Sequence, residues 1–240
     1  LMFSHDWPMT KLIIQSVSKL FPNILLICGG EHISACPEFC MKDCPEIDIC
    51  VFGEGEETSI DLLNAIKEKK SLLNVNGIVF KSEDGLIKNP KRPRINKLEQ
   101  ITWPAWDLFP LENYLSNSFG YGVSTGRSMP MLTSRGCPFP CPYCFNNRYN
   151  ATFKDNGRIV RRRSVDSVIE ETKRLVSEYR VDFIRIQDDV FVLKVDDWIK
   201  EFADKFPSEI GIPYYALMRA ESLTDEMAYY LKKSGCFSLA

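Results

Sequence analysis

The sequence predicts an α/β protein made of two parts and a connector. Short apolar runs alternate with amphipathic stretches up to residue 88, and the same rhythm returns from residue 130 to residue 240. This alternation is typical of parallel strands joined by helices. Residues 89–129 differ because they carry four prolines and few periodic runs, so we expect an ordered connector there, held in place by Trp103, Trp106 and Phe109.

Composition narrows the class of protein. The chain has 240 residues, of which 45% are hydrophobic, and its formal net charge is -2. A core of ordinary size is expected, and the charge balance gives no reason to expect nucleic acid or an anionic membrane as partner. No apolar run approaches the roughly 18 residues that span a bilayer, and no signal peptide is visible.

Cysteine usage and the chain ends give two further expectations. The nine cysteines are an odd number, so they cannot all pair within the chain, and we expect reduced thiols and a cytoplasmic protein. The chain starts at Leu1 inside an apparent element and stops at "GCFSLA", where a strand appears to begin. We therefore expect an internal fragment of a longer protein.

The first part is predicted as two strand and helix units followed by a hairpin. Helical spacing of apolar residues covers 11–20, and "NILLICGG" is a buried strand that ends at Gly29 and Gly30. "IDICVFGEGEE" repeats this pattern and leads into an amphipathic helix over 57–70. "GIVFKSEDGLIKN" predicts a hairpin that turns at Asp84-Gly85.

The second part is predicted as the first part of a (β/α) barrel. Strands are expected at "MPMLTSRGC", "VDFIRIQDD", "IPYYALMRA" and after residue 235. Three helices separate them: one capped by Ser164, one over 195–206, and one that starts at the Thr224 cap and ends at Gly235. Four strands alternating with three helices are typical of such barrels.

The most informative stretch is the loop after the first of these strands. Cys137, Cys141 and Cys144 lie within eight residues, and prolines at 138, 140 and 142 stiffen the loop between them. Thiolates at this spacing bind zinc or an iron–sulfur cluster. A structural zinc site needs four ligands, and no second CxxC pair exists here. Three thiolates leave one iron of a cubane cluster open; a structural zinc site and unrelated reduced thiols are the alternatives.

The loop resembles the signature of the radical S-adenosylmethionine superfamily, CxxxCxΦC with Φ aromatic. The match is complete and includes Tyr143 in the aromatic place. The resemblance implies a 4Fe–4S cluster on the three cysteines, with S-adenosylmethionine chelating the open iron and Tyr143 packing near its adenine. It also implies cleavage of the sulfonium to a 5′-deoxyadenosyl radical, and an electron donor such as flavodoxin or ferredoxin.

Three further residues are candidates for binding S-adenosylmethionine by this resemblance. Asp188 and Asp189 follow the second barrel strand, at the end of such barrels that carries the active site. They stand where the superfamily has its GGE segment, which faces an amino group; the alternative is that they cap the loop. Arg219 ends the third predicted strand and would face a carboxylate, unless it is an ordinary surface arginine.

The first part resembles the cobalamin-binding domain found in many of these enzymes, which has a flavodoxin-like, Rossmann-like fold. Gly29 and Gly30 match the glycine pair that approaches the nucleotide tail of the cofactor, and the GEGE turn and the "WPAWDLFPLENY" connector are also family features. The chain therefore resembles the C-terminal half of that domain, fused to part of a radical S-adenosylmethionine barrel. The DxHxxG loop that carries the cobalt-binding histidine is absent from these residues and is expected before Leu1, so the resemblance still implies cobalamin as a cofactor.

Two clusters keep two interpretations each. Arg158 and Arg161 to Arg163 form a basic run that is either a solvated loop or a contact for an acidic substrate. Cys36, Cys40 and Cys44 lie four residues apart just after His32. On a helix these cysteines would share a face, so they form either a second metal site or part of an apolar core.

These observations leave several functions to compare. The resemblance implies an enzyme that acts on a small-molecule substrate, either by methyl transfer to an unreactive carbon with cobalamin or by oxidative ring closure as in the anaerobic magnesium-protoporphyrin cyclases. A non-catalytic iron–sulfur electron carrier is the alternative from another class, and it is disfavoured by the barrel pattern. A zinc-stabilised nucleic-acid module is disfavoured by the charge balance and by the missing second cysteine pair.

Overall fold

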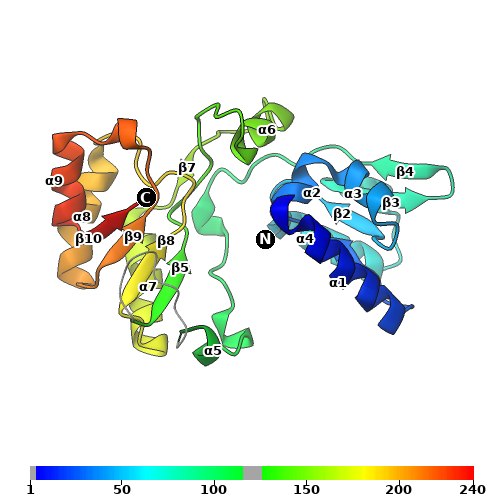
Figure 1. The fold of residues 1–240 in the computed structure, drawn as a ribbon, viewed down its shortest axis with the longest axis horizontal. Helices are drawn as coiled ribbons and strands as arrows, with labels where there is room; N and C mark the ends of the chain where they lie inside the picture. Colours follow the sequence, from blue (N-terminus) through cyan, green and yellow to red (C-terminus); the bar gives the residue numbers. More distant parts are fainter. Residues whose placement is uncertain (1–3, 116–125) are drawn as a thin grey trace. The chain divides into compact units, whose positions relative to one another are not determined.

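The structure is a computed structural model that describes residues 4–115 and 126–240. The chain divides into two compact units (Figure 1), and each is described by itself. The first unit comprises the chain up to residue 96 together with residues 138–158, and the second comprises residues 97–137 and 159–240. The sequence grouped 138–158 with the barrel, whereas their packing groups them with the first unit.

The first unit is a mixed sheet with helices. The sheet has four strands in spatial order: β1 (Ile27–Cys28), β2 (Ile49–Val51), β3 (Ile78–Ser82) and β4 (Gly85–Lys88). β1 and β2 are parallel, and the remaining pairs are antiparallel. Its helices are α1 (Trp7–Leu20), α2 (Glu31–Ala35), α3 (Pro37–Asp43), α4 (Gly55–Lys67) and α6 (Phe145–Thr152). The predicted helices, strand pair and hairpin are present, although β1 is shorter than predicted.

Two local details differ from the sequence prediction. The hairpin loop is Glu83-Asp84 and not Asp84-Gly85, because Gly85 already pairs with Ser82 in the ladder. The cysteines do not share one continuous helix, because the chain is broken at Cys36, whose φ of -150° and ψ of 58° are not helical. Pro37 explains the break, since a proline disfavours the helical conformation in the residue before it.

Helix α6 joins the first unit through aromatic packing. Phe153, directly after the helix, is 1% exposed, and its ring lies 6.4 Å from that of Phe52. The space is tight, because a Cβ added at Gly53 would come within 2.9 Å of the Phe153 ring. Arg94 fixes the same segment by donating to the carbonyl oxygens of Phe153 and Gly157, each at 3.2 Å.

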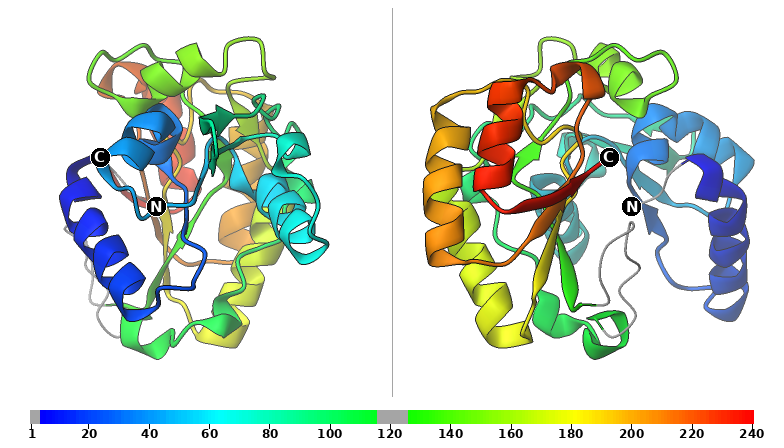
Figure 2. Two further views of the ribbon diagram at one scale, coloured as in Figure 1. Left: turned by 90° about the vertical axis from the view of Figure 1, so that its right-hand side faces the viewer. Right: turned by 60° about the vertical axis from the view of Figure 1, so that its left-hand side comes forward.

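The second unit is built on an all-parallel sheet, which confirms the predicted first part of a (β/α) barrel. Its strands, in spatial and chain order, are β5 (Ser128–Met131), β8 (Phe183–Ile186), β9 (Tyr214–Ala216) and β10 (Cys236–Leu239). Figure 2 shows three helices along this sheet: α7 (Val165–Tyr179), α8 (Asp197–Glu209) and α9 (Asp225–Lys233). Apolar residues of the strands and helices form one core between them.

The predicted helix caps of this unit are confirmed. The Ser164 hydroxyl accepts a hydrogen bond from the amide of Ser167, and Thr224 accepts one from Met227. Both caps satisfy amide donors that the first turn of a helix leaves without a partner. Helix α9 ends at Lys233, two residues before Gly235, whose φ of +88° explains the glycine there.

The remaining elements of the second unit are short. A two-stranded antiparallel ladder pairs β6 (Ser134–Arg135) with β7 (Arg161–Arg162). The connector holds α5 (Glu112–Leu115) and packs Trp106 against the core, while Phe109 stays 56% exposed with its ring 6.5 Å from that of Trp106. Part of the predicted connector, residues 116–125, lies outside the described residues.

Candidate functional site

The site is built at the carboxyl ends of β5 and β8. After β5 ends at Met131, the chain passes through Thr133 and the short strand β6 and reaches Gly136 and Cys137. Gly136 has a φ of +90°, and a Cβ there would come within 2.1 Å of the Ile159 carbonyl oxygen. Only glycine fits this approach, so the residue before the first cysteine is fixed by the backbone.

Asp188 holds the start of this loop. Its carboxylate follows β8, is 0% exposed, and accepts four hydrogen bonds from two consecutive residues. The amides of Thr133 and Ser134 donate to Oδ1 at 2.7 and 3.0 Å, and their hydroxyls donate to Oδ2 at 2.5 and 2.7 Å. One side chain therefore fixes two residues between β5 and the cysteine loop.

Burial sets the acidity of this carboxyl. Removal from water raises the pKa of Asp188 to about 6, although the hydrogen bonds from Thr133 and Ser134 act in the opposite direction. The prediction that Asp188 contacts S-adenosylmethionine is not tested by this geometry. All four contacts are internal, so the arrangement supports a role in positioning the loop.

Asp189 is exposed, and it too contacts the loop. Its Oδ2 accepts a hydrogen bond from the Gly136 amide at 3.0 Å, directly before Cys137. The adjacent carboxylates therefore differ in role: Asp188 is sealed inside, and Asp189 faces outward at the carboxyl end of β8. The carboxyl ends of the strands are where barrels of this kind carry their active sites.

The other two cysteines lie in the first unit. Cys141 and Cys144 share a turn in which the Cys144 amide donates to the Cys141 carbonyl oxygen at 3.1 Å, and α6 begins at the next residue. Cys137, Cys141 and Cys144 are each half-buried. Tyr143, between the last two, is 91% exposed, so its ring is available to stack on a ligand.

Arg219 does not end a strand, contrary to the prediction. β9 stops at Ala216, and Arg219 instead precedes a 3₁₀ turn at Ala220–Ser222. Its guanidinium donates to both carboxylate oxygens of Glu221, at 3.2 and 2.9 Å, and this contact lowers the pKa of Glu221 to about 2. Its predicted role toward S-adenosylmethionine stays a prediction.

The basic run is for the most part not a solvated loop, so that interpretation is wrong for its last three members. Arg158 is exposed, but Arg161 and Arg163 are 5% and 9% exposed. Arg163 forms a buried ion pair with Glu171 of α7 and also donates to the Leu132 carbonyl oxygen at 3.0 Å. Arg163 therefore fills a structural position, because its buried partner Glu171 neutralises it.

The glycine pair follows β1 in the first unit. Gly30 has a φ of +115° and starts α2, so it requires glycine. Gly29 is not constrained in this way, because a Cβ there would meet the Val51 carbonyl oxygen at an ordinary 3.5 Å. The assignment of this pair to cobalamin stays a prediction.

A row of side chains that the sequence analysis missed crosses the second sheet. Pro130, Arg185, Tyr215 and Ser238 are register neighbours on β5, β8, β9 and β10. They alternate with residues that pack under the helices, so they face the side that forms the interior of a barrel. Arg185 Nε and Ser238 Oγ are buried and have no hydrogen-bond partner among the described residues. The strand pattern "FIRIQ" carried the signal, since an arginine between two isoleucines points away from the apolar face.

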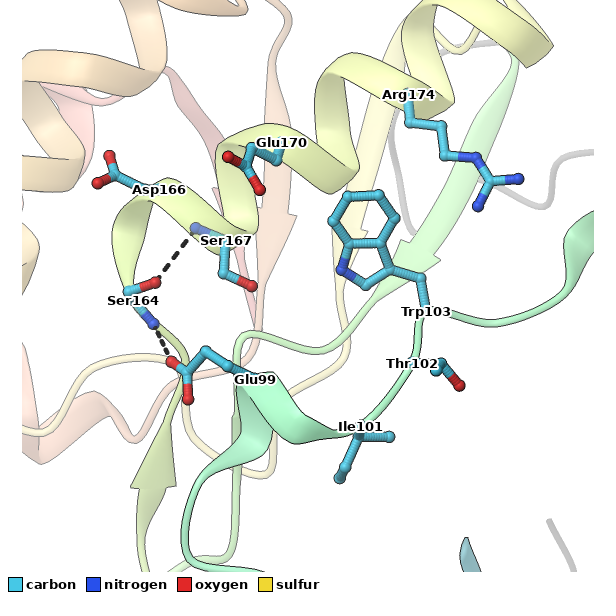
Figure 3. Close-up of a pocket in the computed structure, with 9 residues that line it drawn as sticks. All are labelled: Glu99, Ile101, Thr102, Trp103, Ser164, Asp166, Ser167, Glu170 and Arg174. Atoms are coloured by element: carbon cyan, nitrogen blue, oxygen red, sulfur yellow. Dashed lines mark hydrogen bonds between the residues drawn. The ribbon is translucent and has the colours of Figure 1, made fainter.

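A pocket of about 650 Å³ lies elsewhere in the second unit, between the connector and α7. Figure 3 shows it lined by the connector around Trp103 and by the first turns of α7, where Glu99 accepts a hydrogen bond from the Ser164 amide at 2.7 Å. Its lining includes none of the predicted site residues. We therefore assign it to attachment of the connector.

Sequence comparison places the chain among known enzymes. No family model matches the chain. An uncharacterized methyltransferase from Pyrococcus horikoshii is 32% identical over 218 residues, which are 90% of this chain and 44% of that protein. The anaerobic magnesium-protoporphyrin IX monomethyl ester cyclase of Rubrivivax gelatinosus is 27% identical over 203 residues, 83% of this chain and 34% of that protein. The chain thus spans less than half the length of these curated relatives.

Structure comparison finds the same fold in solved proteins. The radical S-adenosylmethionine methyltransferase TsrM from Kitasatospora setae, solved with cobalamin and a [4Fe-4S] cluster, matches 98% of this chain and 44% of its own at a TM-score of 0.69 and 18% identity. The cobalamin-dependent S-adenosylmethionine radical enzyme OxsB was solved with aqua-cobalamin and S-adenosylmethionine. Its match covers 98% of this chain and 33% of the OxsB chain, with a TM-score of 0.72 and 19% sequence identity. At these sequence identities the comparison shows only that the fold is shared. Together with the sequence relatives they confirm the predicted resemblance and fold class.

Within the described residues, every helix falls short of the length and apolar character that a bilayer crossing requires. The predicted cytoplasmic location stays a prediction.

Proposed function

We propose that this chain is part of a cobalamin-dependent radical S-adenosylmethionine enzyme that transfers a methyl group to an unreactive carbon of a small molecule. The observation that carries the proposal is the CxxxCxΦC loop, whose first cysteine follows a backbone fixed by Gly136 and by the two aspartates after β8. Relatives that include a methyltransferase and a cyclase support the reaction class.

The residues fit an iron–sulfur cluster by the chemistry of their donors. Three half-buried thiols within eight residues supply one ligand to each of three irons, and the fourth iron is left to a substrate. When bound, the cluster supplies the electron that cleaves S-adenosylmethionine into methionine and a 5′-deoxyadenosyl radical. The prolines at 138, 140 and 142 restrict the backbone of the unbound loop, so the loop loses less conformational entropy when the cluster binds.

Other residues are assigned to holding the ligand and the loop. Tyr143 offers an exposed ring for the adenine, and Asp189 offers an exposed carboxylate for the amino group of S-adenosylmethionine. Asp188 acts through the loop and not on the ligand, since its oxygens are occupied by Thr133 and Ser134. Arg185, on the interior face of the sheet, is assigned to an anionic group of the substrate or of S-adenosylmethionine.

Cobalamin is assigned to the first unit. Gly30, which follows β1, presents backbone without a Cβ atom, which allows a large cofactor to approach. When bound, cobalamin supplies the methyl group that is transferred. Oxidative ring closure is the second candidate, and the similarity to the magnesium-protoporphyrin cyclase over 83% of this chain favours it.

The test begins with the cluster. After anaerobic reconstitution, the protein should hold about four irons and four sulfides per chain, and reduction should then produce 5′-deoxyadenosine from S-adenosylmethionine. Replacing Cys137, Cys141 and Cys144 together by alanine should abolish both, whereas Cys44→Ser, a buried cysteine of the first unit, should preserve both. Full iron content in the triple variant would reject the cluster assignment.

Two further measurements separate the alternatives. Uptake of hydroxocobalamin, followed by absorption under anaerobic conditions, distinguishes a cobalamin enzyme from a radical enzyme that works without it. Production of 5′-deoxyadenosine with a reduced flavodoxin or ferredoxin tests the electron donor. A protein that binds the cluster but never cleaves S-adenosylmethionine with any reductant would instead be an electron carrier.

A further inference from the structure

A second group of potential metal ligands lies in the first unit, away from the CxxxCxΦC loop in sequence. His32, Cys36 and Cys40, which we call the thiol–imidazole cluster, place one ring nitrogen and two sulfurs within 4.8 Å of one another. The residues come from α2, from the break at Cys36 and from α3. The break is what turns the Cys36 side chain toward its neighbours on both helices.

The distances suit a tetrahedral metal ion. Cys36 Sγ lies 4.0 Å from Cys40 Sγ and 3.9 Å from His32 Nε2. With Zn–S bonds of about 2.3 Å and Zn–N bonds of about 2.0 Å, a tetrahedral site needs sulfurs about 3.8 Å apart and a sulfur–nitrogen distance of about 3.5 Å. The two pairs that include Cys36 need a contraction of a few tenths of an ångström, and the His32–Cys40 pair, which lies within 4.8 Å, closes by side-chain rotation.

The histidine is already oriented as a ligand. His32 Nδ1 lies 2.9 Å from the Ser4 hydroxyl, and the Trp7 ring packs on the imidazole with centroids 5.1 Å apart. A metal-binding histidine characteristically donates its other ring N–H to a neighbouring acceptor, which fixes the ring. Ser4 can fill that role for Nδ1 and leave Nε2 for the metal.

The charge of the cluster indicates which ion it binds, and the contacts of the neighbouring cysteines indicate which residues are ligands. Two thiolates and a neutral imidazole balance the charge of Zn²⁺, so a partly buried site needs no further counter-charge. Cys44, which continues the same spacing, is not part of the cluster, because its thiol donates to the Glu46 carboxylate at 3.3 Å. Cys50 is likewise directed to the Pro37 carbonyl oxygen, at 3.9 Å.

We propose that His32, Cys36 and Cys40 bind one Zn²⁺ ion, with water completing the tetrahedron. Binding forms two Zn–S bonds and one Zn–N bond, releases one proton from each thiol to solvent, and involves no change of oxidation state. Cys36 gives up its present hydrogen bond to the His32 carbonyl oxygen, 3.3 Å long. This site goes beyond the proposed function, and its existence does not depend on the iron–sulfur cluster.

Cobalt(II) is the probe for the ligand set. We would titrate it into the anaerobic, reduced protein, once with the reconstituted cluster and once in the variant that lacks Cys137, Cys141 and Cys144. One equivalent should bind in both backgrounds, with thiolate-to-cobalt charge-transfer absorption and intense visible bands typical of tetrahedral coordination. Zn²⁺ should displace the cobalt. Trp7 fluorescence should be quenched, because its ring lies against His32.

Single substitutions test each residue. Cys36→Ser, Cys40→Ser and His32→Asn should each weaken binding by at least about 100-fold, and Ser4→Ala by about tenfold as expected for a supporting contact. Cys44→Ser is the matched control, a buried cysteine of the same core, and should bind like the parent. Circular dichroism checks that each variant is folded. If a buried cysteine variant unfolds, His32→Asn, at a partly buried position, still tests whether the cluster binds the metal.

The contrary results are equally specific. Failure of the parent to bind cobalt in either background overturns the site, as does a spectrum without thiolate charge transfer. Binding that survives in Cys36→Ser and Cys40→Ser, or that is lost equally in Cys44→Ser, shows that the cysteines only fill the core.

Discussion

Replacement of Asp188 by alanine should destabilise the second unit strongly, whereas asparagine should be tolerated. Alanine leaves the amides of Thr133 and Ser134 buried without an acceptor, and each such donor costs about 1–3 kcal/mol. The two hydroxyls can rotate to other partners, so we count only the amides. The expected loss in free energy of unfolding is therefore about 2–6 kcal/mol.

Asparagine is the matched control because it has nearly the same shape. Its Oδ1 can accept from the two amides, and its Nδ2 can donate to the hydroxyls of Thr133 and Ser134, which accept as readily as they donate. The loss should stay below about 1 kcal/mol. Urea denaturation, followed by the fluorescence of Trp103, Trp106 and Trp198 of the second unit, measures both variants.

The same pair of proteins tests the raised pKa of Asp188. Because the folded carboxyl binds a proton up to about pH 6 and the unfolded one releases it near pH 4, this group makes the parent less stable as pH rises across that window. The contribution is at most about 3 kcal/mol. It should vanish in Asp188→Asn. Equal losses in the alanine and asparagine variants, or an unchanged pH profile in the latter, would refute the reasoning.

Three further substitutions have sharp expectations. Gly136→Ala should lower the free energy of unfolding by at least about 1 kcal/mol more than Gly85→Ala, and it should lower the iron content of the cluster. Both glycines have a positive φ, but only a Cβ at Gly136 would meet a backbone oxygen. Urea denaturation and an iron assay measure the two effects. Glu171→Ala should lower the free energy of unfolding by about 3–5 kcal/mol, because it leaves the guanidinium of Arg163 buried without its ion-pair partner. Glu178→Ala, which removes one member of an exposed ion pair, should lower it by less than about 1 kcal/mol. Urea denaturation measures both variants. Arg185→Met should keep or raise the free energy of unfolding, because it removes a buried donor that has no partner among the described residues. It should also weaken the binding of S-adenosylmethionine or of the substrate, measured by calorimetry. Unchanged affinity for both ligands would contradict the role assigned to Arg185.

Local patterns predicted the elements of the barrel well. Ser164 and Thr224 were identifiable as caps because a hydroxyl before an apolar helical stripe satisfies free amides in any fold. The carboxyl end of β8 was also predictable, because Gln187 and Asp188 follow an apolar run directly. These features depend on neighbours a few residues away.

What the sequence did not predict depends on distant partners. The burial of Arg163 requires Glu171, which lies on the following helix and carries no mark that distinguishes it from the other acidic residues there. The sealed position of Asp188 requires donors 54 and 55 residues earlier in the chain. The break at Cys36 was predictable in part, since Pro37 disfavours a helical residue before it.

The packing of Phe153 against Gly53 and Phe52 also governs the order in which the chain can fold. The first unit is discontinuous in sequence, so its core lacks the Phe153 ring until synthesis has passed the connector and the cysteine loop. A fragment ending at residue 96 would leave the Phe52 ring and the guanidinium of Arg94 without the partners supplied by residues 150–157. Such a fragment should be more prone to aggregation than one extended to residue 158, even though the sequence predicts that the first part ends at residue 88.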